Sequence, residues 1–274
     1  MPITLYGLKD ALQWGISSNK DVDIYTDTRE YHPNSNIKVY LQVEPNAIYP
    51  CYDYLRENSH LYDTILCYMP EKVGSPNAVK KIDAGTWITE ELYTSIDMDA
   101  KSYSISAMTG WKSDTVGHRL RHQLYFNQTS LRQFPITFFR SSVHPQLPEI
   151  TNNPFIPSDS GTVTRVDGKI ALFNTFQFSI VIENSKENNY FSEKLMDCIL
   201  TKTIPIYYGC PNISEYFDTT GWILIDDGDI VKYMQELNDT YYARYASTVK
   251  ENYERALKFA DRRGLYASMT APYI

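Results

Sequence analysis

The segment from residue 176 to residue 208 constrains the fold more than any other part of the chain. Phe178 to Ile182 is a mostly apolar run, Ser192 to Thr201 places apolar residues at helical spacing, and Thr203 to Tyr208 is a second apolar run. Two such runs joined through one short helix are typical of a βαβ unit with two buried parallel strands. The sequence therefore predicts an α/β fold built on a parallel sheet.

The same alternation of strands and helices extends on both sides of this unit, so we assign residues 101–274 to one domain. The proline-rich segment from Ser141 to Asp167 predicts a long loop inside it. The other expected elements are strands at Tyr103 to Met108, Pro135 to Arg140 and Trp222 to Ile225, and helices near Gly117 to Thr129, at Asp229 to Leu237 and, as a long terminal helix, at Thr240 to Asp261.

Residues 1–100 predict a second, smaller α/β domain. Pro45, directly after Glu44, ends one of its strands. The first fifty residues are short for a complete Rossmann-like domain, so we expect this domain to be trimmed or to be completed by a partner. Its expected elements are strands at Asp21 to Tyr25, Ile37 to Val43 and Thr64 to Tyr68, and a short helix at Tyr52 to Glu57.

Charge and hydropathy exclude several classes of protein. The chain has 274 residues and a formal net charge of −7 at pH 7, whereas proteins that mainly hold nucleic acid carry a basic footprint. No apolar run approaches the roughly 18 residues of a membrane span, and the first residues lack a signal-peptide pattern. The 4 cysteines form no CxxC pair and are expected to be free thiols. We expect a cytoplasmic protein without nucleic-acid partners or a transmembrane segment, and we leave open oligomerisation and peripheral contact with a membrane surface.

Polar residues gather where the first strand of the βαβ unit ends. Glu183 and Asn184 follow the strand directly, and Ser192, Glu193 and Lys194 stand at the start of the next helix. Ligands of open α/β sheets bind at this edge of the sheet. Ser192 is a suitable N-cap, and Lys194 in the first turn favours a shared anion such as phosphate. A solvated lysine paired with a nearby acid is the alternative.

The order of these residues resembles the donor-binding signature of glycosyltransferase family 10, the α1,3/4-fucosyltransferases. Gln177 stands where the family usually has lysine, and Ser192 stands where it has threonine, which keeps a capping hydroxyl. The stretches that carry the resemblance are Phe176-Gln177-Phe178-Ser179-Ile180-Val181-Ile182-Glu183-Asn184-Ser185, Tyr190-Phe191-Ser192-Glu193-Lys194-Leu195 and Thr203-Ile204-Pro205-Ile206-Tyr207-Tyr208-Gly209.

The resemblance implies a GT-B fold, in which two Rossmann-like domains face each other across a cleft and the C-terminal one holds a GDP-sugar. It implies no cofactor besides this donor. Carried over residue by residue, it implies Glu193 for the ribose hydroxyls, Lys194 for the diphosphate, Asn184 and Tyr190 for the diphosphate and sugar region, and Glu183 and Ser192 as supporting residues.

Negative charge develops on the departing diphosphate. An enzyme that uses no metal must stabilise this charge with fixed cations, so a second cation is expected there. The helix near Gly117 offers two arginines, and the pair Leu120-Arg121 matches the family best, so we predict Arg121 for donor binding and Arg119 in support. His118 and His122 can share a helix face, but they lack an acidic companion and stand beside arginines. We therefore predict no metal site.

The acceptor hydroxyl must lose a proton as it attacks, which requires a base. The run Val43-Glu44-Pro45-Asn46 resembles the glutamate-containing motif of the family's N-terminal domain, so Glu44 is the predicted catalytic base. A surface glutamate at a strand end is the alternative.

Two acidic pairs, Asp21 with Asp23 and Asp97 with Asp99, have the DxD spacing of metal-dependent transferases. Neither follows a donor-binding βαβ unit, so we predict that both are solvated turns.

Together with these residues, the resemblance implies inverting, metal-independent transfer of fucose from GDP-fucose to a hydroxyl of a glycan acceptor. One alternative is another nucleotide sugar such as GDP-mannose, because the residues for the diphosphate and ribose do not read the sugar. The other is a non-catalytic glycan-binding protein on the same fold, although binding a glycan alone requires no phosphate pocket.

Overall fold

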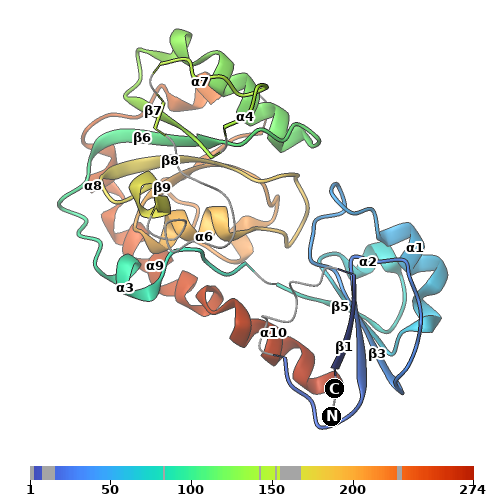
Figure 1. Ribbon diagram of the computed structural model, residues 1–274. Coiled ribbons are helices and arrows are strands. Elements are labelled where there is room, and N and C mark those ends of the chain that lie inside the picture. The colour runs from blue at the N-terminus through green and yellow to red at the C-terminus, as the bar shows by residue number, and fades with distance from the viewer. Residues whose placement is uncertain are drawn as a thin grey trace.

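The computed structural model describes residues 3–7, 16–82, 84–141, 143–151, 153–154, 168–226 and 230–274. These residues form two five-stranded parallel sheets with helices on their faces (Figure 1). The first sheet ends at residue 80 and the second begins at residue 102. The predicted domain boundary at residue 100 therefore falls between the two sheets.

The first sheet has the strand order β1-β2-β3-β4-β5, and all neighbouring strands are parallel. On one face, Tyr25 and Tyr40 pack with Leu55 of helix α1 (Tyr52–Asn58). On the other face, Leu41 packs with Tyr266 of helix α10 (Arg262–Thr270). The second face is thus covered by the C-terminal part of the same chain, where we had expected a trimmed domain or a partner. The strands are β1 (Ile3–Gly7), β2 (Val22–Thr26), β3 (Ile37–Leu41), β4 (Thr64–Cys67) and β5 (Ala78–Lys80).

The second sheet has the strand order β10-β9-β8-β6-β7 and is also parallel. Its strands are buried on both faces. Phe178 packs in the layer that contains Leu120 of α4 (Val116–Phe126), and Val181 packs in the layer that contains Leu195 of α6 (Glu193–Leu200). Strands covered on both faces read as nearly continuous apolar runs, which is why the sequence marks this sheet so clearly. The strands are β6 (Ser102–Thr109), β7 (Ile136–Arg140), β8 (Phe176–Ile182), β9 (Ile204–Tyr208) and β10 (Ile223–Leu224).

The terminal helix was predicted as one piece from Thr240 to Asp261, and this prediction was wrong. The chain breaks at Tyr245 and again at Asp261, where the backbone leaves the helical region and the Asp261 carboxylate accepts the Gly264 N–H at 3.0 Å. A new helix then begins and runs to the first sheet. The helices are α1 (Tyr52–Asn58), α2 (Pro70–Val73), α3 (Glu90–Thr94), α4 (Val116–Phe126), α6 (Glu193–Leu200), α7 (Ile230–Met234), α8 (Tyr241–Arg244), α9 (Ala246–Ala260) and α10 (Arg262–Thr270), with short 3-10 turns η2 (Ser59–Leu61), η3 (Gln128–Leu131), η4 (Ile170–Leu172), η5 (Ile213–Glu215) and η6 (Ala271–Tyr273).

The two acidic pairs have different environments. Asp97 and Asp99 are exposed in a turn, as predicted. Asp23 instead lies fully buried in β2, where its carboxylate accepts the Asn34 and Ser35 N–H groups at 2.6 and 2.9 Å, so its prediction as a solvated turn was wrong. It holds the connection between β2 and β3.

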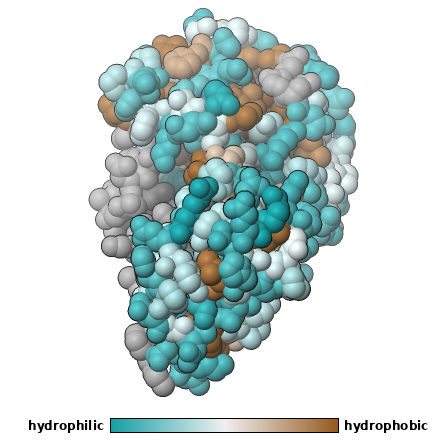
Figure 2. Space-filling view, turned by 90° about the vertical axis from the view of Figure 1, so that its right-hand side faces the viewer, coloured by the Kyte–Doolittle hydropathy of each residue, from teal (hydrophilic) through white to brown (hydrophobic). Residues whose placement is uncertain are grey.

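The surface seen in Figure 2 is mostly hydrophilic, with small and separate hydrophobic areas. Among the helices in the described part of the chain, none combines the length and apolar character that crossing a membrane requires. All four cysteines are buried free thiols. Most of the predicted loop from Ser141 to Asp167 lies outside the described residues.

Candidate active site

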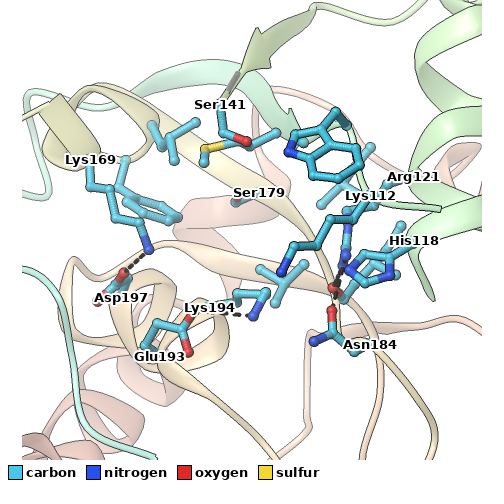
Figure 3. A pocket seen from close by; sticks show the side chains of 18 residues that line it. Lys112, His118, Arg121, Ser141, Lys169, Ser179, Asn184, Glu193, Lys194 and Asp197 are labelled. Carbon is cyan, nitrogen blue, oxygen red and sulfur yellow. Dashed lines mark hydrogen bonds and ion pairs between the residues drawn. The ribbon is translucent and has the colours of Figure 1, made fainter. Parts of the chain in front are cut away.

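The order in which the chain adds strands to the second sheet reverses between β6 and β8. After β6 the chain adds β7 on one side, and it then returns to add β8, β9 and β10 on the other. Ligands of open parallel sheets bind at the carboxyl ends of strands at such a switch point. A cavity of about 350 Å³ lies there (Figure 3), lined by Met108, Gly110, Trp111, Lys112, His118, Arg121, Ser141, Lys169, Leu172, Phe173, Ser179, Ile180, Val181, Ile182, Asn184, Glu193, Lys194 and Asp197.

Helix α4 presents its first turn to this cavity. The Gly117 N–H donates to the Asn184 carbonyl at 3.1 Å, and a Cβ on residue 117 would lie 1.7 Å from the Glu183 carbonyl oxygen. Only glycine permits this approach of the helix to the end of β8. The cavity therefore lies at the positive end of a helix dipole.

Two histidines of α4 hold the loop that leads into the helix. His118 Nδ1 accepts the Thr115 N–H at 3.3 Å, and His122 Nε2 lies 2.8 Å from the Gly110 carbonyl oxygen. Burial, with a smaller contribution from Arg121, lowers the pKa of His118 to about 4, so this cavity-lining imidazole is neutral at neutral pH. The described residues contain no group of three or more His, Cys, Asp or Glu side chains suited to hold a metal.

The two arginines of α4 point in different directions. Arg121 lines the cavity, where it donates to the Ile182 carbonyl and, at 3.0 Å, to Asn184 Oδ1. Burial lowers the pKa of Arg121, and the nearby carboxylate of Glu183 opposes this shift. Arg119 is exposed and donates to the Asp114 carbonyl at 3.0 Å. The structure thus brings Arg121, but not Arg119, to the cavity.

Glu183 holds the start of α6 through hydrogen bonds to Ser192. Its carboxylate is fully buried and accepts both the Ser192 N–H at 2.8 Å and the Ser192 hydroxyl at 2.6 Å. Ser192 Oγ in turn accepts the Lys194 N–H at 3.3 Å as the N-cap of α6. Burial raises the pKa of Glu183, and Lys194 and the hydrogen bonds from Ser192 offset part of that rise. The end of β8 and the first turn of α6 therefore form one connected unit.

Glu193 and Lys194 line the cavity from the first turn of α6. Their side chains form an ion pair with an N to O distance of 3.1 Å and remain 18% and 31% exposed. Burial by itself would lower the pKa of Lys194, but the carboxylates of Glu193 and Glu183 outweigh it, and the pKa is raised. Lys194 is therefore a cation beside the cavity at neutral pH.

Some lining residues were missed by the sequence reasoning. Lys169 and Asp197 form a buried ion pair at 3.2 Å on the opposite side of the cavity from Arg121 (Figure 3). The Asp197 carboxylate also accepts the Thr86 hydroxyl and the Trp87 N–H, at 2.6 and 2.8 Å. An aspartate in the middle of an amphipathic helix was the available signal for this pair, since an acid among buried residues needs partners.

Glu44 and Tyr190 do not line the cavity. Glu44 follows β3 in the first sheet, is partly buried and donates its backbone N–H to Asp27 Oδ2 at 2.7 Å. Tyr190 is buried, and its ring packs edge-on against Tyr68 at a centroid distance of 5.2 Å. Burial raises the pKa of Tyr190, and the negative charge of Glu44 contributes to the rise. The Tyr190 ring thus lies at the contact between the two sheets.

Sequence comparisons match the part of the chain that carries this cavity. The family model described as glycosyltransferase family 10 (fucosyltransferase), C-terminal, matches residues 161–265. The α-(1,3)-fucosyltransferase FucT of Helicobacter pylori is 30% identical over 88 residues, which are 32% of this chain. The matched segment spans 17% of the length of that curated relative.

Structural comparisons cover nearly the whole chain. An α1,3-fucosyltransferase solved with GDP aligns with a TM-score of 0.55 and 13% identity over 98% of this chain and 88% of its own. The glycosyltransferase TarM aligns with a TM-score of 0.57 and 11% identity over 92% of this chain and 54% of its own. At such identities the likeness establishes the fold alone, which is GT-B. The chain thus has the GT-B fold, and the match of its residues 161–265 to the C-terminal region of glycosyltransferase family 10 confirms the resemblance to that family.

Proposed function

We propose that this protein is an inverting glycosyltransferase that transfers fucose from GDP-fucose to a hydroxyl of a glycan acceptor. The carrying observation is the cavity at the switch point, whose described lining holds the cations of Lys112, Arg121, Lys169 and Lys194 against the carboxylates of Glu193 and Asp197. Its excess positive charge suits a nucleoside diphosphate. The α1,3-fucosyltransferase of similar fold that was solved with GDP supports guanosine as the nucleoside.

The donor is proposed to bind with its diphosphate between α4 and α6. Both helices present their first turns to the cavity, so both dipoles favour an anion there. Lys194 and Arg121 would stabilise the charge that develops on the departing GDP. Glu193 would accept hydrogen bonds from the ribose hydroxyls, and Asn184 would contact the diphosphate and sugar region.

The acceptor is proposed to be activated by Glu44. This carboxylate would take the proton of the acceptor hydroxyl while the acceptor oxygen attacks the anomeric carbon and the bond to GDP breaks. Attack from the side opposite the leaving group inverts that carbon, as in glycosidases that use one carboxylate as base. The proposed reaction uses no metal, because the fixed cations of the cavity would stabilise the negative charge that develops on the departing GDP.

A nucleotide panel tests the donor assignment. Thermal unfolding is measured with GDP, UDP, CMP and ADP, each with EDTA and with Mn²⁺. A ligand at 100 times its Kd stabilises the native state by about 2.7 kcal/mol. We expect stabilisation by GDP that is insensitive to EDTA. Preference for another nucleotide, or dependence on Mn²⁺, would overturn the donor assignment. If GDP stabilises the protein, GDP-fucose and GDP-mannose are then compared as donors in a transfer assay.

Two substitutions test the proposed roles of Lys194 and Glu44. Lys194→Ala should weaken GDP binding, whereas Lys186→Ala should not. Lys186 is a matched control, because its side chain is equally 31% exposed, forms one ion pair with Asp226 and does not line the cavity. Glu44→Gln should keep GDP binding and lose transfer. Unchanged turnover in Glu44→Gln would remove its role as base.

A further inference from the structure

The loop between β8 and α6 contacts both halves of the proposed active site. Asn184, near its start, lines the cavity, and its end leads directly into Glu193 and Lys194 of α6, which also line the cavity. Its middle extends toward the first sheet (Figure 1) and contacts it through Glu187 and Asn189. One continuous segment therefore connects the proposed donor site to the N-terminal part of the molecule.

Glu187 is the residue of this loop that reaches the segment carrying Glu44. It is 7% exposed, and its Oε2 accepts the Asn46 backbone N–H at 2.8 Å. Its Oε1 accepts the hydroxyl of Tyr52, which is also buried. Asn46 stands two residues after Glu44, so the Glu187 carboxylate fixes the backbone directly beside the proposed base.

A second buried carboxylate, that of Asp27, also holds this segment. Asp27 accepts the Val43 and Glu44 N–H groups at 3.1 and 2.7 Å. Pro45 has no N–H, so every backbone N–H between residues 43 and 46 donates to a carboxylate oxygen. Hydrogen bonds to charged groups are stronger than neutral ones, which makes this a rigid support. Asp27 belongs to the sheet that carries Glu44, whereas Glu187 comes from the sheet that carries the cavity.

Contacts other than those of Glu187 also join the two sheets. Asn189 Nδ2 donates to the Tyr68 carbonyl at 2.7 Å, and the rings of Tyr68 and Tyr190 pack at 5.2 Å. These contacts remain when Glu187 is replaced. The specific effect of losing Glu187 should therefore fall on the segment from residue 43 to residue 46.

We infer that Glu187 is a positioning residue, which sets the Glu44 backbone relative to the sugar donor by bonding the Asn46 N–H and the Tyr52 hydroxyl. This inference rests on the proposed function. A base must stand at a defined distance from the acceptor hydroxyl, and that hydroxyl must be aligned with the anomeric carbon of the donor. Because the loop has proposed donor-binding residues near its start and directly after its end, and contacts the base segment at its middle, it fixes the position of the base relative to the donor.

The test compares Glu187→Ala with Glu236→Ala, which removes an exposed glutamate far along the chain. Glu187→Ala should lower kcat for fucose transfer by roughly tenfold to a hundredfold, as expected for a small misplacement of a reacting group. The donor KM and the affinity for GDP should stay near the values of the unaltered protein. Hydrogen exchange of the Asn46 amide should become faster in the same variant.

Two further variants keep the test decisive if Glu187→Ala does not fold. Glu187→Gln retains an acceptor for Asn46 and a polar group for Tyr52, so it should recover most of the lost kcat. Tyr52→Phe removes the hydroxyl that donates to the carboxylate and should lower kcat by roughly three- to tenfold. An unchanged kcat in Glu187→Ala overturns the inference, and if that variant does not fold, an unchanged kcat in Tyr52→Phe overturns it. A fall in GDP affinity that matches the fall in kcat also overturns it.

Failure of the proposed function is recognised separately. If the unaltered protein binds GDP but transfers no sugar from any donor, the proposed activity is wrong and the catalytic part of this inference falls with it. The Asn46 amide then still decides whether Glu187 holds the segment, because its exchange rate requires no turnover.

Discussion

The carboxylate of Asp27 holds a segment of the proposed site, although burial of this carboxylate in its ionised form is unfavourable for stability. It stands directly after β2 in the left-handed region of the backbone, with φ of 43°, which turns its carboxylate toward the segment after β3. It is 8% exposed. Burial raises its pKa from 3.8 to about 6, and the hydrogen bonds from Glu44 and Val43 offset part of the rise.

This raised pKa predicts a pH dependence of stability. The native state binds the Asp27 proton more tightly than the unfolded chain, so its contribution is fully present below about pH 4 and is lost as the pH rises through about 6. A difference of about two pKa units corresponds to about 3 kcal/mol. Urea unfolding at several pH values should show that the stability of the protein, measured relative to Asp27→Asn, falls between pH 4 and pH 7. A difference that stays constant across this range would contradict the assignment.

At the level of elements, the start of α4 packs closely against the backbone at the end of β8. The contact depends on Gly117, where a Cβ would lie 1.7 Å from a backbone oxygen that cannot move without disturbing β8. Cavity-lining residues on both sides, His118 in the helix and Asn184 after the strand, depend on this contact for their separation.

Gly117→Ala should therefore destabilise the protein by about 2 kcal/mol or more, as overpacking against fixed atoms does. Helix propensity alone would predict the opposite sign, a gain of up to about 1 kcal/mol. Urea unfolding distinguishes the two, with Gln123→Ala at an exposed position of the same helix as the control. A stabilised Gly117→Ala would show that the helix does not approach β8 so closely.

The elements differ in how far the sequence predicts them. Strands β8 and β9 and helix α6 were predicted almost at their observed bounds, because an apolar run and an N-cap at Ser192 are local signals. Strands β1 and β5 were missed. Strand β5 has three residues and exists through its pairing with β4, which no local pattern records. The predicted end of the terminal helix at Asp261 agrees with the end of α9, but the break at Tyr245 and the new helix α10 were missed, because no proline marks either.

The residues of the candidate site also differ in whether local sequence or the tertiary fold determines their position. Asn184, Glu193 and Lys194 are close in sequence and were predicted together, and all three line the cavity. Lys169 reaches the cavity from a different segment, and its pairing with Asp197 depends on the tertiary fold. No single sequence motif predicts the strand order that brings such residues together. The roles of Glu44 and of the donor-binding residues remain predictions.

At the scale of the whole molecule, the two sheets are tied together by the chain's own C-terminal segment. Helix α9 packs against α6 of the second sheet, whereas α10 lies against the first sheet (Figure 1). Tyr266 of α10 is fully buried among Ile24, Leu41 and Leu66. The first sheet thus obtains part of its core from residues near the other end of the sequence.

Tyr266→Ala should destabilise the first sheet although the residue is distant in sequence. Truncating a buried aromatic side chain costs about 3 to 5 kcal/mol. Hydrogen exchange should become faster in β2 and β3, with a smaller change in β8 and β9, while Ser268→Ala at an exposed position of the same helix leaves both unchanged. Equal protection of β2 in Tyr266→Ala and the unaltered protein would show that α10 is not part of this core.

The return of α10 to the first sheet also bears on how the protein is made. A ribosome synthesises the strands of the first sheet early, but the helix that covers one of their faces emerges only after residues 262–270 have been added. Until then, the apolar face formed by Val22, Ile24, Val39 and Leu41 lacks its cover on the nascent chain. Domains usually fold in the order of their synthesis, and exposed apolar surface at that stage attracts chaperones or promotes aggregation. In this protein the sheet that is translated first is among the last parts to be completed.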